Sequence, residues 1–401
     1  MKAIFSIFFI ISCLIATATN RYVATNGSDS YAGTNALPYL TIQKGLDMAA
    51  AGDTVFVKDG TYTTTDVTQL VISWSKTGTA LAPIVVKAVN KWGAILDGQS
   101  NHTANCFDLG HASSYLVFDG FEIIGFQHDA FLFIESSHHL TVQNNKIHAI
   151  GKQCYDSDSG QGGIYLNTTS NNIIDRNVIY DIGRYASGEN GCSPSTAYWK
   201  NHDHGIYISS EVNGLIVSRN LIYDCTAGWC IQIYNGSTAN DSYVSIINNT
   251  FSEPNTQEPG HIIISQSHQI NLLIANNIFY NPTTTAIDID GYGTLESSVI
   301  KNNMTYNGTI TNLSPSGLTI TGNLNNTNPL MVDAANHNFA LTGTSPAKNA
   351  GVDVGLYTDY AGNYYHGLPD IGAYEYVSYP LPKYNIVKKH KTVVKKHKAM
   401  R

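Results

Sequence analysis

The sequence has 401 residues and a low charged content of 13%, combined with 34 glycines and 25 tyrosines. Almost no window shows the 3.6-residue periodicity of an amphipathic helix, which excludes a helical bundle. The net charge is −7, and every Asp and Glu lies before residue 377. This acidic part of the chain would repel phosphate, so nucleic acid is disfavoured as a partner.

The first 18 residues have the pattern of a secretory signal. Lys2 precedes an apolar run over residues 4–15, and residues 16–18 match an A-x-A cleavage site. The run is too short to span a bilayer as a stable helix. We therefore expect a signal peptide over residues 1–18 and a protein that is secreted, at the cell surface or in the periplasm. A lipoprotein modified at Cys13 is the weaker alternative, because apolar residues rather than a polar tether follow it.

Residues 41–51 are the clearest exception to the non-helical pattern. Ile42, Leu46 and Ala49 share one face of a helix at this spacing. We expect this helix to cap the first coil of the repeats described next, because a solenoid must cover its exposed end.

An asparagine returns once per repeat between two short β-branched runs. Its successive spacings of 32, 43, 29, 28, 26 and 20 residues suit one coil of a parallel β-helix plus loops of variable length. Its amide can bond to the copies above and below, and asparagine tolerates the left-handed backbone of a tight bend. The repeating residues are Asn145, Asn177, Asn220, Asn249, Asn277, Asn303 and Asn323. They predict an all-β, single-domain solenoid over residues 19–376.

Each coil also carries an apolar run with period-two alternation. The inward positions are predicted at Ile164, Ile206, Ile231, Ile262 and Ile287. One outward column consists of Tyr165, Tyr207, Gln232, Ile263 and Asp288, and a second of Asn167, Ser209, Tyr234, Ser265 and Asp290. With coils ~4.8 Å apart, a groove along this face would run from Tyr165 past His261 to Asp288 and would hold several sugars. A polar and aromatic face of this kind is typical of a sugar-binding surface.

The two longest insertions, residues 151–162 and 183–204, both enter this face. Long loops on a rigid scaffold are where function is expected. Cys154 and Cys192 fall in these two loops and are the preferred disulfide pair of an exported chain, leaving Cys106, Cys225 and Cys230.

Residues 377–401 form a separate basic tail with eight Lys or Arg and no acid. We expect it to be disordered and either to adhere to anionic wall or membrane polymers or merely to solubilise the chain end.

Scaffold segments carry a family resemblance. Arg21-Tyr-Val-Ala-Thr-Asn-Gly-Ser-Asp-Ser, Gly52-Asp-Thr-Val-Phe-Val-Lys-Asp-Gly-Thr-Tyr62 and Pro369-Asp-Ile-Gly-Ala-Tyr-Glu-Tyr376 resemble secreted right-handed parallel β-helix proteins of the pectate-lyase-like superfamily. The resemblance covers residues 21–376. It implies a right-handed β-helix, a carbohydrate polymer as ligand and commonly eliminative cleavage of uronate chains, sometimes with Ca²⁺. No complete lyase motif is present, so no catalytic residue carries over by family pattern.

Candidate catalytic residues therefore come from chemistry. Elimination across a uronate needs a neutralised carboxylate and a base beside the adjacent carbon proton. The densest suitable cluster is Lys200-Asn-His-Asp-His204. We expect His202 or His204 as base, since histidine titrates near the working pH. Lys200 or Arg184 would clamp the carboxylate, and Tyr207 would serve as platform or proton donor. The alternative is that the histidines only fix their own loop. The predicted substrate-binding residues are Tyr165, Asn167, Gln232, Tyr234, His261, Glu211 and Asp288.

Metal binding is a second expectation for these loops. Asp156, Asp158 and Glu189 could bring oxygen ligands to Ca²⁺, although such spacing is also common in solvated loops. His202 and His204 share one side of an extended run and could instead bind a transition metal. No organic cofactor is expected.

Three functions compete. The leading one is a polysaccharide lyase or a related uronan-modifying enzyme such as an epimerase. The second is a glycoside hydrolase with paired carboxylates drawn from Asp158, Glu189, Asp203 and Glu211. The third is a non-catalytic, polysaccharide-binding adhesin. The expected partner in each case is a polysaccharide, with an acidic polymer favoured, and the protein is expected to be a monomer.

Overall fold

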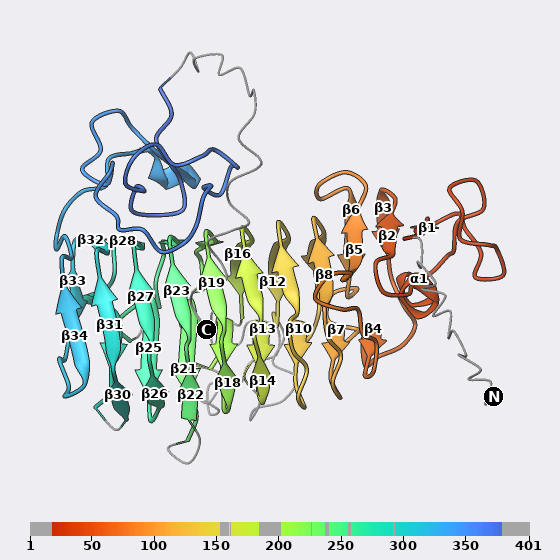
Figure 1. The fold of residues 1–401 in the computed structure, drawn as a ribbon, viewed down its shortest axis with the longest axis horizontal. Coiled ribbons are helices and arrows are strands. Elements are labelled where there is room, and N and C mark those ends of the chain that lie inside the picture. Colours follow the sequence, from red (N-terminus) through yellow and green to blue (C-terminus); the bar gives the residue numbers. More distant parts are fainter. Residues whose placement is uncertain are drawn as a thin grey trace, which may run out of the picture.

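The computed structural model describes residues 18–152, 160, 162–183, 202–225, 227–236, 240–255, 258–291 and 293–378. Over these ranges the chain winds into a solenoid whose coils follow one another along the long axis of Figure 1. The prediction of a right-handed parallel β-helix is confirmed. None of the helices in these ranges is long and apolar enough to cross a membrane.

Three long parallel sheets run along the solenoid, and each complete coil contributes one strand to each sheet. Sheet A contains β1 (Asn20–Val23), β2 (Thr54–Val57), β5 (Ile84–Ala88), β8 (Leu116–Asp119), β11 (Thr141–Gln143), β15 (Ile173–Asp175), β19 (Ile216–Ser218), β23 (Ser245–Ile247), β27 (Leu273–Ala275), β31 (Ser298–Lys301) and β34 (Leu318–Thr321). Sheet B contains β3 (Gly60–Tyr62), β6 (Ala94–Asp97), β9 (Glu122–Ile124), β12 (Lys146–Ile150), β16 (Val178–Ile182), β20 (Leu221–Ile222), β24 (Thr250–Phe251), β28 (Ile278–Tyr280) and β32 (Met304–Tyr306). Sheet C contains β4 (Gln69–Ser73), β7 (Asn105–Leu109), β10 (Asp129–Phe133), β13 (Gly162–Leu166), β17 (His204–Ile208), β21 (Ile231–Tyr234), β25 (Ile262–Ser265), β29 (Thr285–Ile289) and β33 (Thr309–Thr311).

A short fourth sheet, sheet D, lines the corner between sheets C and A. Its strands are β14 (Thr169–Ser170), β18 (Val212–Asn213), β22 (Asn240–Ser242), β26 (His268–Ile270) and β30 (Thr294–Glu296). Outside the solenoid, β35 (Met331–Asp333) and β36 (Asn338–Leu341) pair antiparallel around the 3₁₀ turn η3 (Ala334–Asn336).

The interior is a continuous apolar column. The five isoleucines predicted to point inward from sheet C are fully buried, and they pair in register from coil to coil. In the amino-terminal coils phenylalanine replaces them, and the Phe107 ring stacks on Phe131 with centroids 4.9 Å apart. Burying a large apolar side chain contributes ~1.5–3 kcal/mol, so this column supplies the main stabilisation of the solenoid.

The asparagine ladder forms as predicted. From Asn177 onward, each side-chain Oδ1 accepts hydrogen bonds from the backbone N–H and the Nδ2 of the asparagine one coil earlier, as between Asn220 and Asn177 at 2.8 and 3.0 Å. The six contacts from Asn145 to Asn323 repeat this geometry. One detail of the prediction is wrong. The left-handed residue is the one before each ladder asparagine, for example Arg176 at φ 54°, because the ladder side chain must point inward while its predecessor makes the bend.

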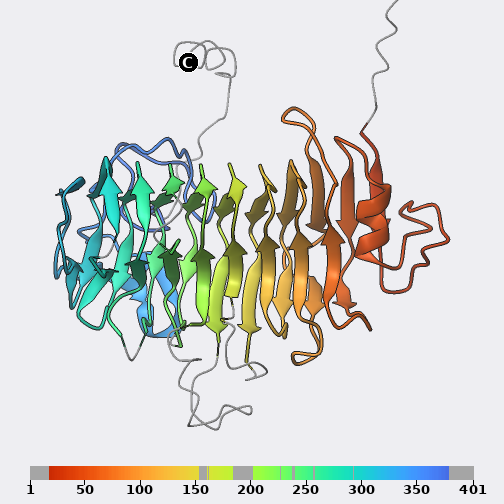
Figure 2. The same cartoon turned by 90° about the horizontal axis from the view of Figure 1, so that it is seen from below.

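The predicted capping helix is present but shorter than expected. Helix α1 (Ile42–Met48) starts after Thr41, whose hydroxyl accepts the Lys44 N–H at 3.1 Å. A Cβ at Gly45 would lie 2.7 Å from the Val55 side chain, so glycine lets the helix pack closely on β2. Figure 2 shows α1 covering the amino-terminal end of the coils.

The carboxy-terminal segment folds back along sheet B, as the blue ribbon shows in Figure 1. Residues at the left-handed bends bind it: Arg219 Nη1 donates to the Thr358 carbonyl at 2.9 Å, and Asn276 Nδ2 donates to the Val352 carbonyl at 2.8 Å. The coils from β16 to β32 are therefore covered on this side.

Some predictions fall outside the described residues. These are the signal segment over residues 1–17, the tail beyond residue 378, and the proposed disulfide between Cys154 and Cys192. Cys106, Cys225 and Cys230 are buried free thiols.

Candidate functional site

A groove of about 380 Å³ opens on the outward face of sheet C. We call it the sheet C groove, and it is lined by Gly160, His202, His204, Tyr207, Trp229, Gln232, Tyr234, Ile263 and Ser265. The parallel register places Tyr207 beside Gln232 and Gln232 beside Ile263, because outward residues of successive coils stack one above the other. The structure thus brings together His202, His204, Tyr207, Gln232 and Tyr234, five of the residues chosen from the sequence.

His204 is held as a neutral side chain at the start of β17. Its Nδ1 accepts the backbone N–H of Trp229 at 3.2 Å, which places the proton of the neutral ring on Nε2. Burial is the main cause that lowers the pKa of His204 to about 3, reinforced by His202 and opposed by a hydrogen bond with Gln232. Because the lone pair of Nδ1 is already engaged, His204 is suited to orienting its neighbours rather than to removing a proton.

Two glycines make this arrangement sterically possible. A Cβ at Gly228 would overlap the Asp203 carbonyl oxygen and lie 2.8 Å from His204 Nδ1, where it would interfere with the approach of Trp229. A Cβ at Gly160 would likewise overlap the His202 carbonyl oxygen. Glycine at both positions lets neighbouring loops close around the two histidines.

Aromatic rings continue the site by one coil. Tyr165 lies beside Tyr207 in register, and their rings meet edge to face with centroids 5.2 Å apart. Tyr207 also contacts the His204 ring at 5.4 Å. Asn167 Nδ2 donates to the Tyr165 hydroxyl at 3.1 Å, which leaves that hydroxyl able to donate to a ligand. Tyr165 and Asn167 therefore extend the sheet C groove toward the amino-terminal coils.

His261 does not belong to the outward face, and its prediction as a surface residue is wrong. Its side chain is fully buried, with ring centroids 6.1 Å from Phe251 and 5.8 Å from Phe279. Period-two alternation holds only within a strand, and β25 begins at Ile262, so the pattern could not place the residue before it. Burial lowers the pKa of His261 to about 3, and the Tyr280 backbone only partly offsets this effect.

Two other predicted binding residues lie outside the groove lining. Glu211 is exposed in the turn before β18, in the left-handed region at φ 58°. Asp288 is half-buried in β29 opposite Ile263, one coil beyond the groove, and Asn312 Nδ2 donates to it. Burial, and then Asp290 and Glu258, raise the pKa of Asp288.

The remaining predicted site residues lie outside the described residues. They are Lys200 and Arg184, the proposed carboxylate clamps, and Asp156, Asp158 and Glu189, the proposed Ca²⁺ ligands. Within the described ranges, no three His, Cys, Asp or Glu side chains gather in a way that could hold a metal ion.

Sequence reasoning missed Asp129 and Trp229. Asp129 begins β10 opposite Gly162, where a Cβ would lie 2.8 Å from Asp129 Oδ1. Burial raises the pKa of Asp129 to about 8. Aligning residues 128–131 with the later coils would have placed Asp129 at the strand position that Gly162 and His204 occupy in the next two coils. Trp229 carried no repeat signal, because it precedes its strand.

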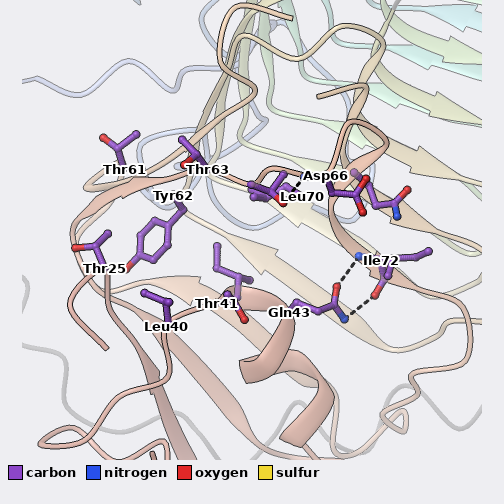
Figure 3. A pocket seen from close by; sticks show the side chains of 13 residues that line it. Thr25, Leu40, Thr41, Gln43, Thr61, Tyr62, Thr63, Asp66, Leu70 and Ile72 are labelled. Atoms are coloured by element: carbon purple, nitrogen blue, oxygen red, sulfur yellow. Dashed lines mark hydrogen bonds between the residues drawn. The ribbon is translucent and has the colours of Figure 1, made fainter. Parts of the chain in front are cut away.

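A larger cavity of about 490 Å³ lies at the amino-terminal end, between α1 and strands β3 and β4 (Figure 3). Two of its polar side chains are already hydrogen-bonded: Gln43 bonds both the N–H and the carbonyl of Ile72, and the Tyr62 hydroxyl donates to the Lys58 carbonyl at 2.7 Å. Among the described residues that line it, Asp66 is the single carboxylate, and it accepts from Thr68. These contacts stabilise the cap. The described lining contains no His, Lys or Arg to act with Asp66 as an acid–base pair, so we place the candidate chemistry in the smaller sheet C groove.

Comparison with known proteins decides the family. A family described as "Pel9A-like, right handed beta helix region" matches residues 21–227, about half of the sequence. The chain belongs to this Pel9A-like family. The match ends at Ala227, so it contains β17 and the two groove histidines.

A curated relative and a solved structure agree with membership of the Pel9A-like family. "Pectate lyase PEL9" of Emericella nidulans is 29% identical over 214 residues, which are 49% of this chain and 51% of the relative. The chain therefore spans about half the length of that relative. The crystal structure of pectate lyase Pel9A superposes with a TM-score of 0.62 at 17% identity, covering 90% of this chain and 97% of the other. At this identity the superposition supports the fold alone.

Proposed function

We propose that the protein is a polysaccharide lyase that cleaves a uronate-containing polymer by elimination in the sheet C groove. The observation that carries the proposal is the convergence of two imidazoles with tyrosine and amide side chains in one groove of a Pel9A-like β-helix. A pectate-type polymer is the substrate class that the relatives' names suggest.

The reaction fits the groups lining the groove. A base takes the proton from the carbon next to the uronate carboxylate, the bond from the neighbouring carbon to the glycosidic oxygen breaks, and a carbon–carbon double bond forms between them. The leaving oxygen takes a proton from water. His202 is the base in this proposal. The pKa of His204, which burial lowers to about 3, makes that ring a weak base, and its Nδ1 lone pair already accepts the Trp229 N–H.

Tyr207 and Tyr165 serve as the sugar platform. Edge-to-face packing against His204 and against each other fixes both rings at the groove, so little side-chain entropy is lost when a sugar binds. Gln232 and Tyr234 lie on the next coil and can hydrogen-bond sugar hydroxyls.

Neutralising the substrate carboxylate needs a cation. Lys200 and Arg184 remain our proposals for this role. Ca²⁺ would also neutralise the substrate carboxylate. Asp129 could provide one oxygen ligand for it, because a bound cation would favour the ionised carboxylate and so lower the pKa that burial raises. A single carboxylate is not a complete calcium site, so no step of the reaction is assigned to the metal.

The hydrolase alternative loses support from the groove lining. No carboxylate is among the described residues that line it, Asp203 is fully buried, and Glu211 lies in a turn outside it. A hydrolase needs two carboxyl groups facing the same bond. We also propose export through residues 1–18, testable by amino-terminal sequencing of secreted protein.

Product analysis tests the proposal. Incubation with de-esterified polygalacturonate, alginate or a glycosaminoglycan should yield an ultraviolet-absorbing unsaturated product from one of them. New reducing ends without that absorbance would indicate hydrolysis, and retention on a polymer column without any product would indicate a binding protein.

A further inference from the structure

The face of sheet C that holds the groove continues toward the amino terminus and ends in an exposed tryptophan. Trp74 follows β4 and is 49% exposed, an unusual state for so large an apolar side chain. Backbone hydrogen bonds between neighbouring strands show which residues stand beside it. The Gly110 N–H donates to the Ser73 carbonyl, and the Asn167 N–H donates to the Phe133 carbonyl. Trp74 thus stands in the outward column that leads through Asn167 to Tyr234 in the groove.

The surroundings of Trp74 hold its ring in place. A Cβ at Gly110 would lie 3.5 Å from the indole and 3.3 Å from the Ile134 side chain, so the ring packs along a position without a side chain. On another side the His111 ring meets the indole edge on, with centroids 4.8 Å apart. His111 is itself fixed by Glu135, with Nδ1 2.5 Å from Oε2. A pocket of about 330 Å³ adjoins Trp74 and is lined in part by Ser73, Ser75 and Lys76.

The charges around Trp74 differ from those needed for a uronate. Asp108 and Glu135 both lie near it: the indole interacts with Asp108, and Glu135 pairs with the His111 ring that contacts the indole. Burial and the Glu135 charge raise the pKa of Asp108, while Trp74 and His111 act in the opposite direction. The nearby Lys76 donates its Nζ to the Asp47 carbonyl at 2.8 Å. A sugar carboxylate over the ring would meet two acids, whereas an uncharged sugar would meet only hydrogen-bonding groups and an aromatic surface.

The spacing suits a polymer that also occupies the groove. From β4 to β17 there are four coil steps, so Trp74 lies roughly 19 Å from the Tyr207 position along the axis. Leu132 and Ile134 lie half-buried on β10 between them, and Tyr165 continues the strip on β13. An extended polysaccharide bound in the groove can therefore reach Trp74 a few sugar residues away.

We propose that Trp74, with Gly110, His111 and Asp108, forms a distal subsite that stacks an uncharged sugar of the polymer, such as a methyl-esterified uronate. This inference rests on the proposed function, because it takes the polymer to lie along sheet C. It predicts that the protein distinguishes polymers by esterification at a position remote from the groove.

Affinity electrophoresis in gels containing matched polymers tests the subsite. The probes are one polygalacturonate preparation in de-esterified and in heavily methyl-esterified form. Trp74→Ala should weaken binding to the esterified polymer by roughly 3- to 10-fold and to the de-esterified polymer by less than about twofold, whereas Trp74→Phe should keep most of the affinity. Tyr357→Ala, an exposed tyrosine outside sheet C at 71% exposure, is the matched control. Thermal unfolding of each variant verifies that it is folded.

The outcomes separate the two proposals. If the wild type binds a polymer and Trp74→Ala is retained by it equally well, the subsite is overturned and the proposal for the groove is unaffected. A larger loss on the de-esterified polymer would overturn the claim that the sugar is uncharged. Wild-type protein that is retained by neither polymer would contradict a pectate-type substrate, and with it the basis of the subsite.

Discussion

Breaking the asparagine ladder at its middle should destabilise the solenoid far more than breaking it at its end. Asn220 is fully buried, accepts from the N–H and Nδ2 of Asn177, and donates to the Ile174 carbonyl at 2.9 Å and to Asn249 Oδ1 at 3.0 Å. Asn220→Ala removes four hydrogen bonds in one step. Asn177 Nδ2 keeps its bond to the Val142 carbonyl, but the Asn177 backbone N–H loses its acceptor.

The magnitude follows from these contacts. Each lost hydrogen bond costs ~0.5–1.5 kcal/mol, and an orphaned buried N–H adds ~1–3 kcal/mol. We therefore expect the free energy of unfolding to fall by about 3–9 kcal/mol for Asn220→Ala. The control is Asn323→Ala at the last position of the ladder, where the side chain is only half-buried and water can replace it. Its expected cost is about 1 kcal/mol.

Urea unfolding followed by far-ultraviolet circular dichroism measures both variants. Because repeat arrays can unfold in parts, the slope of the transition is compared along with its midpoint. Equal losses for the two variants, or a loss below about 1 kcal/mol for Asn220→Ala, would refute the view that the buried ladder amides stabilise the coils.

Three further predictions concern titration, metal binding and the sugar platform. The pKa of His261 is about 3 in the folded state, against 6.5 for an exposed histidine. Between about pH 3 and pH 6.5 the unfolded chain therefore binds a proton at this residue that the folded chain does not. The free energy of unfolding consequently falls as the pH falls through this range. His261→Leu should flatten that decline by up to ~1.4 kcal/mol per pH unit, measured by urea midpoints, and an unchanged slope would mean that the ring is protonated in the fold. Ca²⁺ should raise the thermal unfolding midpoint of the wild type and not of Asp129→Asn; an equal rise in both would exclude Asp129 as a ligand. Tyr207→Phe keeps the ring, so its turnover should stay within about tenfold of the wild type, whereas the turnover of Tyr207→Ala should fall much further. Equal losses of turnover in the two variants would show that the hydroxyl takes part in the reaction.

Repetition explains why the fold could be derived from the sequence. The coils from β13 to β29 give their inward isoleucine and their ladder asparagine the same surroundings. The same residue types therefore return at the same place, and Ile206 and Asn220 could be assigned from the sequence alone. The alternation then fixed which side chains share the outward face, and Tyr207, Gln232 and Tyr234 meet in the groove accordingly.

The turns between strands are where this reasoning failed. His261 lies one residue before its strand and turns into the core, and the left-handed position belongs to Arg176 rather than to Asn177. Turn conformation depends on contacts between coils that no short sequence window contains. The same holds for Trp229, whose N–H fixes the tautomer of His204 from a turn one coil away.

The rate of elimination by a groove variant tests the central claim most directly. Initial formation of ultraviolet-absorbing product from de-esterified polygalacturonate is measured for the wild type, for His202→Gln in the groove and for Tyr357→Ala outside it. Loss of a general base lowers the rate ~10²- to 10⁴-fold, so His202→Gln should fall by that factor with an unchanged unfolding midpoint, while Tyr357→Ala keeps the wild-type rate. A folded His202→Gln protein that forms product at the wild-type rate would contradict the assignment of His202 as the base in the sheet C groove.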